Sequence, residues 1–172
     1  MSATPSARRN FLRGRFQRLD DDAMQPPWAV ADMVDLCTSC GDCARACPQG
    51  IILRDADHRP VVDLHRDACT FCRACADACE TGALDPALPL DWPWRANVTL
   101  DNCLSAQGVY CRACEDSCDA LAIRFRLAVG GRSLPIIDFG QCTGCGACAS
   151  VCPNQAVGFA RHAAIQKEKA KE

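Results

Sequence analysis

The chain has 172 residues and a formal net charge of −2 without a basic stripe, which argues against nucleic acid as its main partner. It has no apolar run near the roughly 18 residues that a membrane-spanning helix needs, so we expect no membrane span. Sixteen cysteines accompany only six Phe, three Trp and one Tyr, and such a chain needs metal ligation to supply much of its folding free energy.

Residues 1–34 are predicted to form an irregular N-terminal extension. Arg8 and Arg9, followed by Phe11 and Leu12, resemble the start of a twin-arginine export signal. The residues that follow, 14–22, are rich in charge and cannot serve as the apolar core of a signal, so we do not expect export. Two interpretations stay open: a basic amphipathic segment in which these four residues bind a partner, or a solvated chain end.

Residues 35–85 are predicted to form a first module on two cysteine runs of the same spacing, C-x2-C-x2-C-x3-C. Three sulfurs of such a run point inward from one short loop. Between the runs, the apolar residues 51–53 and 61–64 flank a polar turn and predict a short β-hairpin. The two runs are Cys37, Cys40, Cys43 and Cys47, then Cys69, Cys72, Cys75 and Cys79.

Residues 86–96 are rich in proline and tryptophan, which breaks regular structure, and are predicted to be a linker. Residues 97–160 repeat the pattern as a second module, with a hairpin of residues 122–127 and 134–139. Residues 161–172 are predicted to be a charged, solvated tail. The runs of the second module, the first of which has an enlarged first loop, are Cys103, Cys111, Cys114 and Cys118, then Cys142, Cys145, Cys148 and Cys152.

Glycines and short helices complete the predicted cysteine loops. Gly41, Gly144 and Gly146 lie between cysteines, where the backbone must turn and can present N–H groups to sulfur, and such hydrogen bonds raise a reduction potential. The fourth cysteine of each run is expected where a helix begins. Alanine-rich helices, which can approach a cluster closely, are expected from 44–46 onward, from 74–78 onward, at 113–118 and at 147–150.

The spacing is that of cubane iron–sulfur clusters, so the chain is predicted to hold four [4Fe–4S] clusters. In two-cluster ferredoxins the fourth cysteine of each run ligates the cluster of the other run. Applied in tandem, this rule predicts an α+β protein of two tandem bacterial 2[4Fe–4S] ferredoxin-like modules. A nested pairing, first run with last and second with third, remains open. The tandem ligand sets are Cys37, Cys40, Cys43 with Cys79; Cys69, Cys72, Cys75 with Cys47; Cys103, Cys111, Cys114 with Cys152; and Cys142, Cys145, Cys148 with Cys118.

Disulfides and structural zinc are the competing interpretations of the sixteen cysteines. Disulfide scaffolds come with a secretory signal, which we do not find. Structural zinc prefers two C-x2-C pairs separated by a dozen or more residues, often with histidine, whereas these sets are tight and contain none. Reduced thiols favour the cytoplasm. Because no Ser-His-Asp set, phosphate loop or dinucleotide fingerprint is present, we expect no enzymatic site of its own.

The sequence resembles the NapF family, the ferredoxin-type accessory proteins of bacterial periplasmic nitrate reductase systems. The resemblance rests on residues 7–14 with the paired arginines, on residues 26–28, on all four cysteine runs with the enlarged third, and on residues 122–126. It implies a cytoplasmic protein that interacts with the catalytic molybdenum subunit before that subunit is exported. It further implies help with insertion or maintenance of the subunit's own iron–sulfur cluster.

Three roles follow as hypotheses. An assembly protein would act only while the catalytic subunit matures. An electron relay would pass electrons one at a time from a donor to a redox enzyme on every turnover. A four-cluster electron-transfer subunit of a larger oxidoreductase would co-purify with it in a fixed ratio.

Overall fold

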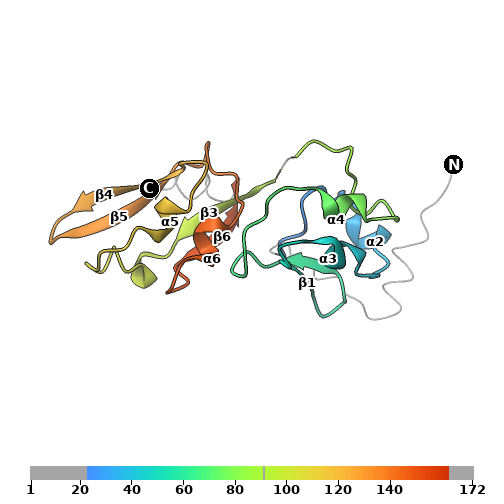
Figure 1. Cartoon of the computed structure of the whole chain (residues 1–172), viewed down its shortest axis with the longest axis horizontal. Helices are drawn as coiled ribbons and strands as arrows, with labels where there is room; N and C mark the ends of the chain where they lie inside the picture. Colours follow the sequence, from blue (N-terminus) through green and yellow to red (C-terminus); the bar gives the residue numbers. More distant parts are fainter. Residues whose placement is uncertain (1–22, 91, 163–172) are drawn as a thin grey trace.

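The computed structural model describes residues 23–90 and 92–162, which form two lobes next to each other (Figure 1). We call residues 23–90 the first lobe and residues 92–162 the second lobe. Short helices and two-stranded antiparallel sheets make up both, so the fold class is α+β. No helix in these ranges is long and apolar enough to cross a membrane. The first lobe contains α2 (Met33–Leu36), α3 (Asp42–Ala46), β1 (Ile52–Arg54), β2 (Pro60–Val62) and α4 (Ala74–Asp77). The second lobe contains β3 (Trp94–Val98), η1 (Leu100–Asn102), α5 (Ala113–Asp116), β4 (Ile123–Ala128), β5 (Arg132–Ile137), α6 (Ala147–Ser150) and β6 (Val157–Arg161).

The first lobe has one hairpin and a core to which Trp92 and Trp94 of the second lobe also contribute. β1 and β2 pair antiparallel, with Ile52 opposite Val62, close to the predicted hairpin. Met33, Ile51 and Leu64 are each only 2% exposed and lie at the centre of the core. Burying side chains of this size contributes about 1.5–3 kcal/mol each.

Residues 24–34 pack onto the first lobe, which differs from the expectation of an irregular extension up to residue 34. The backbone N–H of Val62 donates to the carbonyl of Met24 at 2.7 Å, and Ala29 forms an isolated β-bridge with Leu84. The side chains of Met24 and Trp28 pack against the core. The hairpin alone offers too small an apolar surface, so this segment is needed to close it.

The second lobe has two sheets. β4 and β5 form the second predicted hairpin, with Ile123 opposite Ile137. β3 pairs antiparallel with β6, with Trp94 opposite Arg161. The last residues of the predicted linker, 94–96, are therefore strand rather than irregular. The alternation of buried side chains explains why residues 94–96 form a strand: Trp94 and Ala96 are 6% and 1% exposed, and both face a core.

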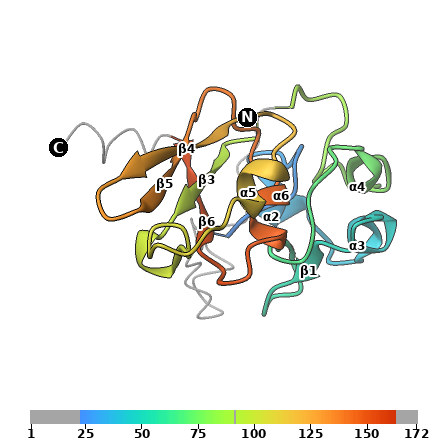
Figure 2. The ribbon, with the colours of Figure 1, turned by 60° about the vertical axis from the view of Figure 1, so that its left-hand side comes forward.

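A one-turn helix begins just before the third cysteine of each run and ends before the fourth. The expectation that the fourth cysteine begins a helix is wrong; Cys47, for example, is the C-cap of α3, with extended backbone. The chain turns into three of these helices through a left-handed residue: Gly41 at φ 81°, Arg73 at φ 68° and Gly146 at φ 94°. Helix α3 packs against α4, and α5 against α6 (Figure 2).

Candidate metal centre

The structure gathers the sixteen cysteines around four pockets, four to a pocket. Each pocket takes three cysteines from one run and the fourth from the other run of the same lobe, a grouping that coincides with the tandem ligand sets. We number the pockets by the run that supplies three cysteines. Site 1 has Cys37, Cys40, Cys43 and Cys79; site 2 has Cys69, Cys72, Cys75 and Cys47; site 3 has Cys103, Cys111, Cys114 and Cys152; site 4 has Cys142, Cys145, Cys148 and Cys118.

All sixteen cysteines lie in the described residues, and all are free thiols. The disulfide interpretation therefore has no support in the fold. Cys75 and Cys148 are buried, whereas Cys40 and Cys72 are exposed. Sites 1 and 2 therefore each have one cysteine at the surface. Within residues 23–90 and 92–162, no three His, Cys, Asp or Glu side chains are grouped as the ligands of a single metal ion.

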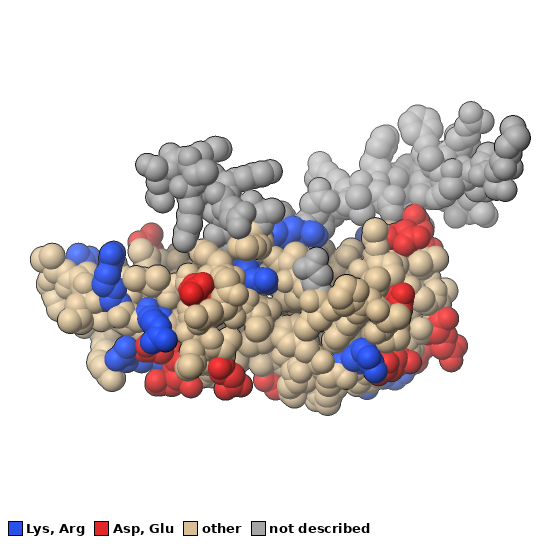
Figure 3. Space-filling model, turned by 90° about the horizontal axis from the view of Figure 1, so that it is seen from above, with Lys and Arg blue, Asp and Glu red and all other residues tan. Residues whose placement is uncertain are grey.

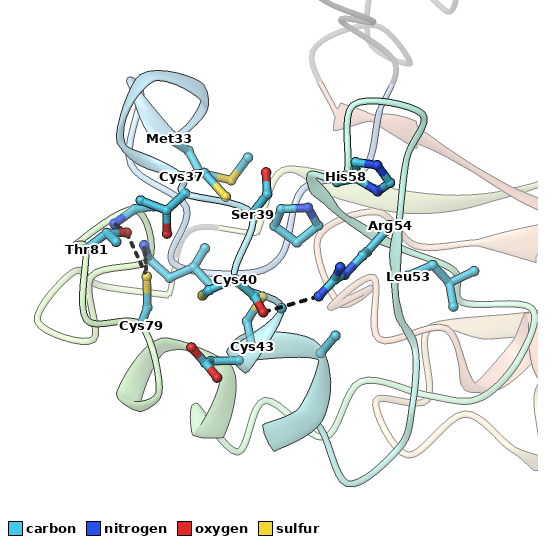
Figure 4. Close-up of a pocket in the computed structure, with 17 residues that line it drawn as sticks. Met33, Cys37, Ser39, Cys40, Cys43, Leu53, Arg54, His58, Cys79 and Thr81 are labelled. Atoms are coloured by element: carbon cyan, nitrogen blue, oxygen red, sulfur yellow. Dashed lines mark hydrogen bonds between the residues drawn. The ribbon is translucent and has the colours of Figure 1, made fainter.

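Site 1 shows how the loops position the thiols (Figure 4). Cys37 and Cys40 come from the loop before α3, Cys43 from its first turn, and Cys79 from the segment after α4. The guanidinium of Arg54 donates to the carbonyl of Cys40 at 3.2 Å. Sequence reasoning missed Arg54, because nothing in a hairpin strand marks an arginine that folds back over a cysteine loop.

Burial raises the pKa of the third cysteine of every run. The pKa reaches about 12 for Cys75 and Cys148 and about 11 for Cys114, and it also lies above its ordinary value for Cys43. Thiolates of the same pocket repel one another and add to this shift, as Cys103, Cys111 and Cys152 do around Cys114. The third cysteine of each run therefore needs the positive charge of bound metal ions to be held as a thiolate.

The fourth cysteines of three runs accept backbone hydrogen bonds. The N–H groups of Leu84, Ala122 and Ala156 donate to the sulfurs of Cys79, Cys118 and Cys152 at 3.4, 3.4 and 3.2 Å respectively. Burial acts to raise the pKa of Cys79, but hydrogen bonds from Thr81, Leu84 and Ala83 outweigh it and leave the pKa lowered. Bonds of this kind stabilise a thiolate and raise the reduction potential of a cluster.

Two glycines of the fourth run lie against the first-lobe core and its tryptophans. A Cβ on Gly144 would stand 2.2 Å from the carbonyl oxygen of Trp94, and a Cβ on Gly146 would stand 2.7 Å from Leu64 Cβ. The indole N–H of Trp92 donates to the carbonyl of Gly144 at 3.2 Å. Sequence reasoning predicted the glycines but placed the tryptophans in a linker. The signal it passed over is that two of only three tryptophans fall within three residues.

Three acidic side chains near the cysteine loops form ion pairs with arginines. Asp42 forms an ion pair with Arg45, Asp77 with Arg73, and Glu115 with Arg112. These pairs are partly to largely exposed to solvent, so they contribute little to stability. Figure 3 shows Asp and Glu side chains along one edge of a face, with arginines beside them.

The four residues assigned to partner binding, Arg8, Arg9, Phe11 and Leu12, lie outside the described residues. The structure consequently neither brings them to a site nor separates them from one. The same holds for the tail beyond residue 162.

Comparisons with known proteins agree with the cysteine pattern. Families described as "4Fe-4S dicluster domain" match residues 29–84, 108–156 and 3–52. The first match spans both runs of the first lobe; the second begins after Cys103. The chain is 37% identical over 161 residues to the "Ferredoxin-type protein NapF" of Haemophilus influenzae, covering 87% of this chain and 91% of that protein. It is 36% identical over 154 residues to the protein of the same name from Escherichia coli K12, covering 88% and 93%.

Proposed function

Because the chain belongs to the NapF family of iron–sulfur, ferredoxin-type proteins, we propose that it holds four [4Fe–4S] clusters and assists the maturation of a periplasmic nitrate reductase. The observation that supports the four clusters is the set of cysteine thiols at each pocket. Each pocket offers four free thiols, three from one short loop and the fourth from the other run of the lobe, which is the number and softness of ligand that a cubane takes from a protein.

The residues around each pocket fit such a group. At site 1, Met33 and Leu84 line the pocket with apolar surface and are each 2% exposed, so they shield the inner side of the site from water. The N–H of Leu84 donates to Cys79 from the same wall. When bound, the clusters supply one-electron transfer; the chain ligates them, shields them and sets their potential through these hydrogen bonds.

The tandem arrangement is part of the proposal. Each lobe would carry one two-cluster ferredoxin module, the first holding sites 1 and 2 and the second holding sites 3 and 4. Support comes from the separate dicluster matches at 29–84 and 108–156 and from pockets that each draw their cysteines from one lobe. All sixteen cysteines would be ligands.

The proposed partner is the catalytic molybdenum subunit of a periplasmic nitrate reductase, met in the cytoplasm before export. The support is the family membership and the N-terminal motif with Arg8, Arg9, Phe11 and Leu12, which we propose as the segment that contacts this subunit. The chain would deliver electrons or cluster components during assembly and would receive electrons from a separate donor. It would have no substrate chemistry of its own.

An electron relay is the second candidate. It is favoured by the exposure of Cys40 and Cys72, since ligands at the surface bring sites 1 and 2 within reach of a partner's redox centre. The two roles differ in when the protein is needed. An assembly protein acts before the enzyme is complete, and a relay acts at every turnover.

The test uses nitrate reductase prepared from cells with and without this protein. We expect mature enzyme from complete cells to show the same activity, with an artificial electron donor, whether or not this protein is added. Enzyme from cells that lack the protein should carry less iron. The Arg8→Ala/Arg9→Ala variant should not restore the iron, whereas the equally charge-depleted Arg15→Ala/Arg18→Ala variant should.

Two results would contradict the proposal. Mature enzyme that still needs this protein at every turnover would favour the relay. Full iron content in enzyme from cells without it would remove the assembly role.

A further inference from the structure

We infer that the two lobes exchange electrons through the contact between sites 2 and 4, so that the four clusters form one path in the order site 1, site 2, site 4, site 3. This inference rests on the proposed function, because it requires all four sites to be loaded. The inference goes beyond the proposed function because it makes the protein one continuous electron-transfer path rather than two independent ferredoxins.

A direct hydrogen bond joins cysteines of the two sites. The backbone N–H of Cys69 in the first lobe donates to the carbonyl of Cys145 in the second lobe at 2.7 Å. Standard bond lengths then keep the two Cα atoms within about 7 Å of each other. No side chain separates these residues along the bond, so the ligand loops of sites 2 and 4 are in contact.

Trp92 packs between the same two loops. Its ring meets Phe71 edge to face with centroids 6.3 Å apart, and Phe71 lies between Cys69 and Cys72 of site 2. Its indole N–H donates to Gly144, which lies between Cys142 and Cys145 of site 4. Trp92 is only 5% exposed, so this contact between the two loops is shielded from solvent.

Leu64 of the first lobe and Gly146 of the second lobe also pack against each other at this contact. Leu64 is 2% exposed, and its side chain occupies the space where a Cβ on Gly146 would lie. Phe159 of β6 packs against the cores of both lobes and meets His65 of the first lobe with ring centroids 6.4 Å apart. This close packing holds the ligand loops at one separation.

Sites 1 and 3 lie at the outer ends of the path. The contacts between the lobes described above involve the ligand loops of sites 2 and 4 and none of the cysteines of sites 1 and 3. Figure 1 shows α6, which carries Cys148 of site 4, on the side of the second lobe that faces the first, and the β4–β5 hairpin at the far end. Within each lobe the sites are joined by their exchanged fourth cysteines.

The step itself moves one electron and nothing else. The cysteines of sites 2 and 4 would each hold a cluster that supplies one-electron transfer: one electron would leave site 2 and reach site 4, with no proton transferred and no bond formed or broken. The first electron comes from an external one-electron reductant of low potential, for which dithionite serves in the test. Trp92 and Gly146 act as positioning residues because they set the separation of the two ligand loops.

Two double variants of the full-length, cluster-loaded protein test the order. Cys40→Ser/Cys111→Ser removes one ligand from each outer site and should leave sites 2 and 4 with about eight iron atoms. After dithionite reduction its EPR spectrum should show spin–spin splitting. Cys72→Ser/Cys142→Ser should leave sites 1 and 3 with the same iron content and no splitting.

Equal splitting in both variants, or splitting only in the second, would overturn the inference. Wild-type protein without about sixteen iron atoms would instead contradict the proposed function, so the two failures are distinguishable.

If the double variants lose all their iron, a pair of glycine variants tests the inferred electron path instead. Gly146→Ala forces Leu64 away and should change the spin–spin splitting of the fully reduced protein. Gly41→Ala is the matched control away from the contact between the lobes: it has the same place in its run and a similar positive φ, but the three atoms nearest to its Cβ belong to the flexible end of Arg54 at site 1. A Gly146→Ala spectrum no different from that of Gly41→Ala, at full iron content, would overturn the inference.

Discussion

Replacing Cys111 with serine is expected to remove the cluster of site 3 and to lower the iron content from about sixteen to about twelve atoms per chain. Serine keeps the size of the side chain but removes the soft thiolate. Any secondary effect should fall on site 4, because Cys152 and Cys118 are exchanged between these two sites. Iron analysis with EPR of the reduced protein measures both effects.

The matched control is Cys40→Ser, which changes the second cysteine of the first run. It should remove the cluster of site 1 and leave the signals of the second lobe intact. If Cys111→Ser disturbed a cluster of the first lobe instead, the second and third runs would be partners, and the nested pairing would replace the tandem one.

Removing the metal is expected to unfold most of the chain. The second-lobe core has only five buried residues, and three of them are Ala96, Ala149 and Cys148, so little apolar surface remains to hold the loops when their ligands are free. Circular dichroism of the chelator-treated, reduced protein should show loss of regular structure and no cooperative melt, whereas the loaded protein should melt cooperatively. A cooperative melt of the iron-free chain would contradict this.

The rate of metal loss should increase as the pH falls. Burial raises the pKa of Cys75 and Cys148 to about 12 in the absence of metal, so protons compete strongly with iron for these two sulfurs. A raised pKa favours the protonated thiol, and the proton is therefore the better competitor at lower pH. Loss to a chelator should be faster at about pH 6 than at about pH 8; an equal rate at both would mean that protonation does not limit release.

The sequence could predict the cysteine sets because the information is local. Three ligands of each site fall within twelve residues, and in three of the runs within seven, so spacing alone determines which sulfurs share a loop. Both hairpins were predicted for the same reason, with apolar segments on either side of a turn, such as the one at Gly130 and Gly131 in the second hairpin. The left-handed φ of these glycines, 79° and 73°, costs little without a side chain.

The pairing of β3 with β6 could not be predicted in this way. Trp94 lies opposite Arg161, far along the chain, and prolines before it indicate a break. Local propensity carries no information about such a distant partner. The contact of Cys69 with Cys145 was missed for the same reason, since it depends on how two lobes pack.

The place of the fourth cysteine was misjudged for a geometric reason, although the helices expected at 74–78, 113–118 and 147–150 begin at the observed first residue. In three of the four runs a left-handed residue before the third cysteine turns the chain directly into the helix, so that the helix carries this cysteine rather than the fourth. Glycine signals this conformation at Gly41 and Gly146, but Arg73 adopts it too, at φ 68°. An arginine gives no such signal in a sequence.

The most direct test of the account is to count iron and acid-labile sulfide in protein purified without oxygen. Four cubanes require about sixteen iron atoms and about sixteen sulfide ions per chain, with EPR signals of reduced [4Fe–4S] clusters after dithionite. Zinc in place of iron, or cysteines oxidised to disulfides with no sulfide present, would contradict it.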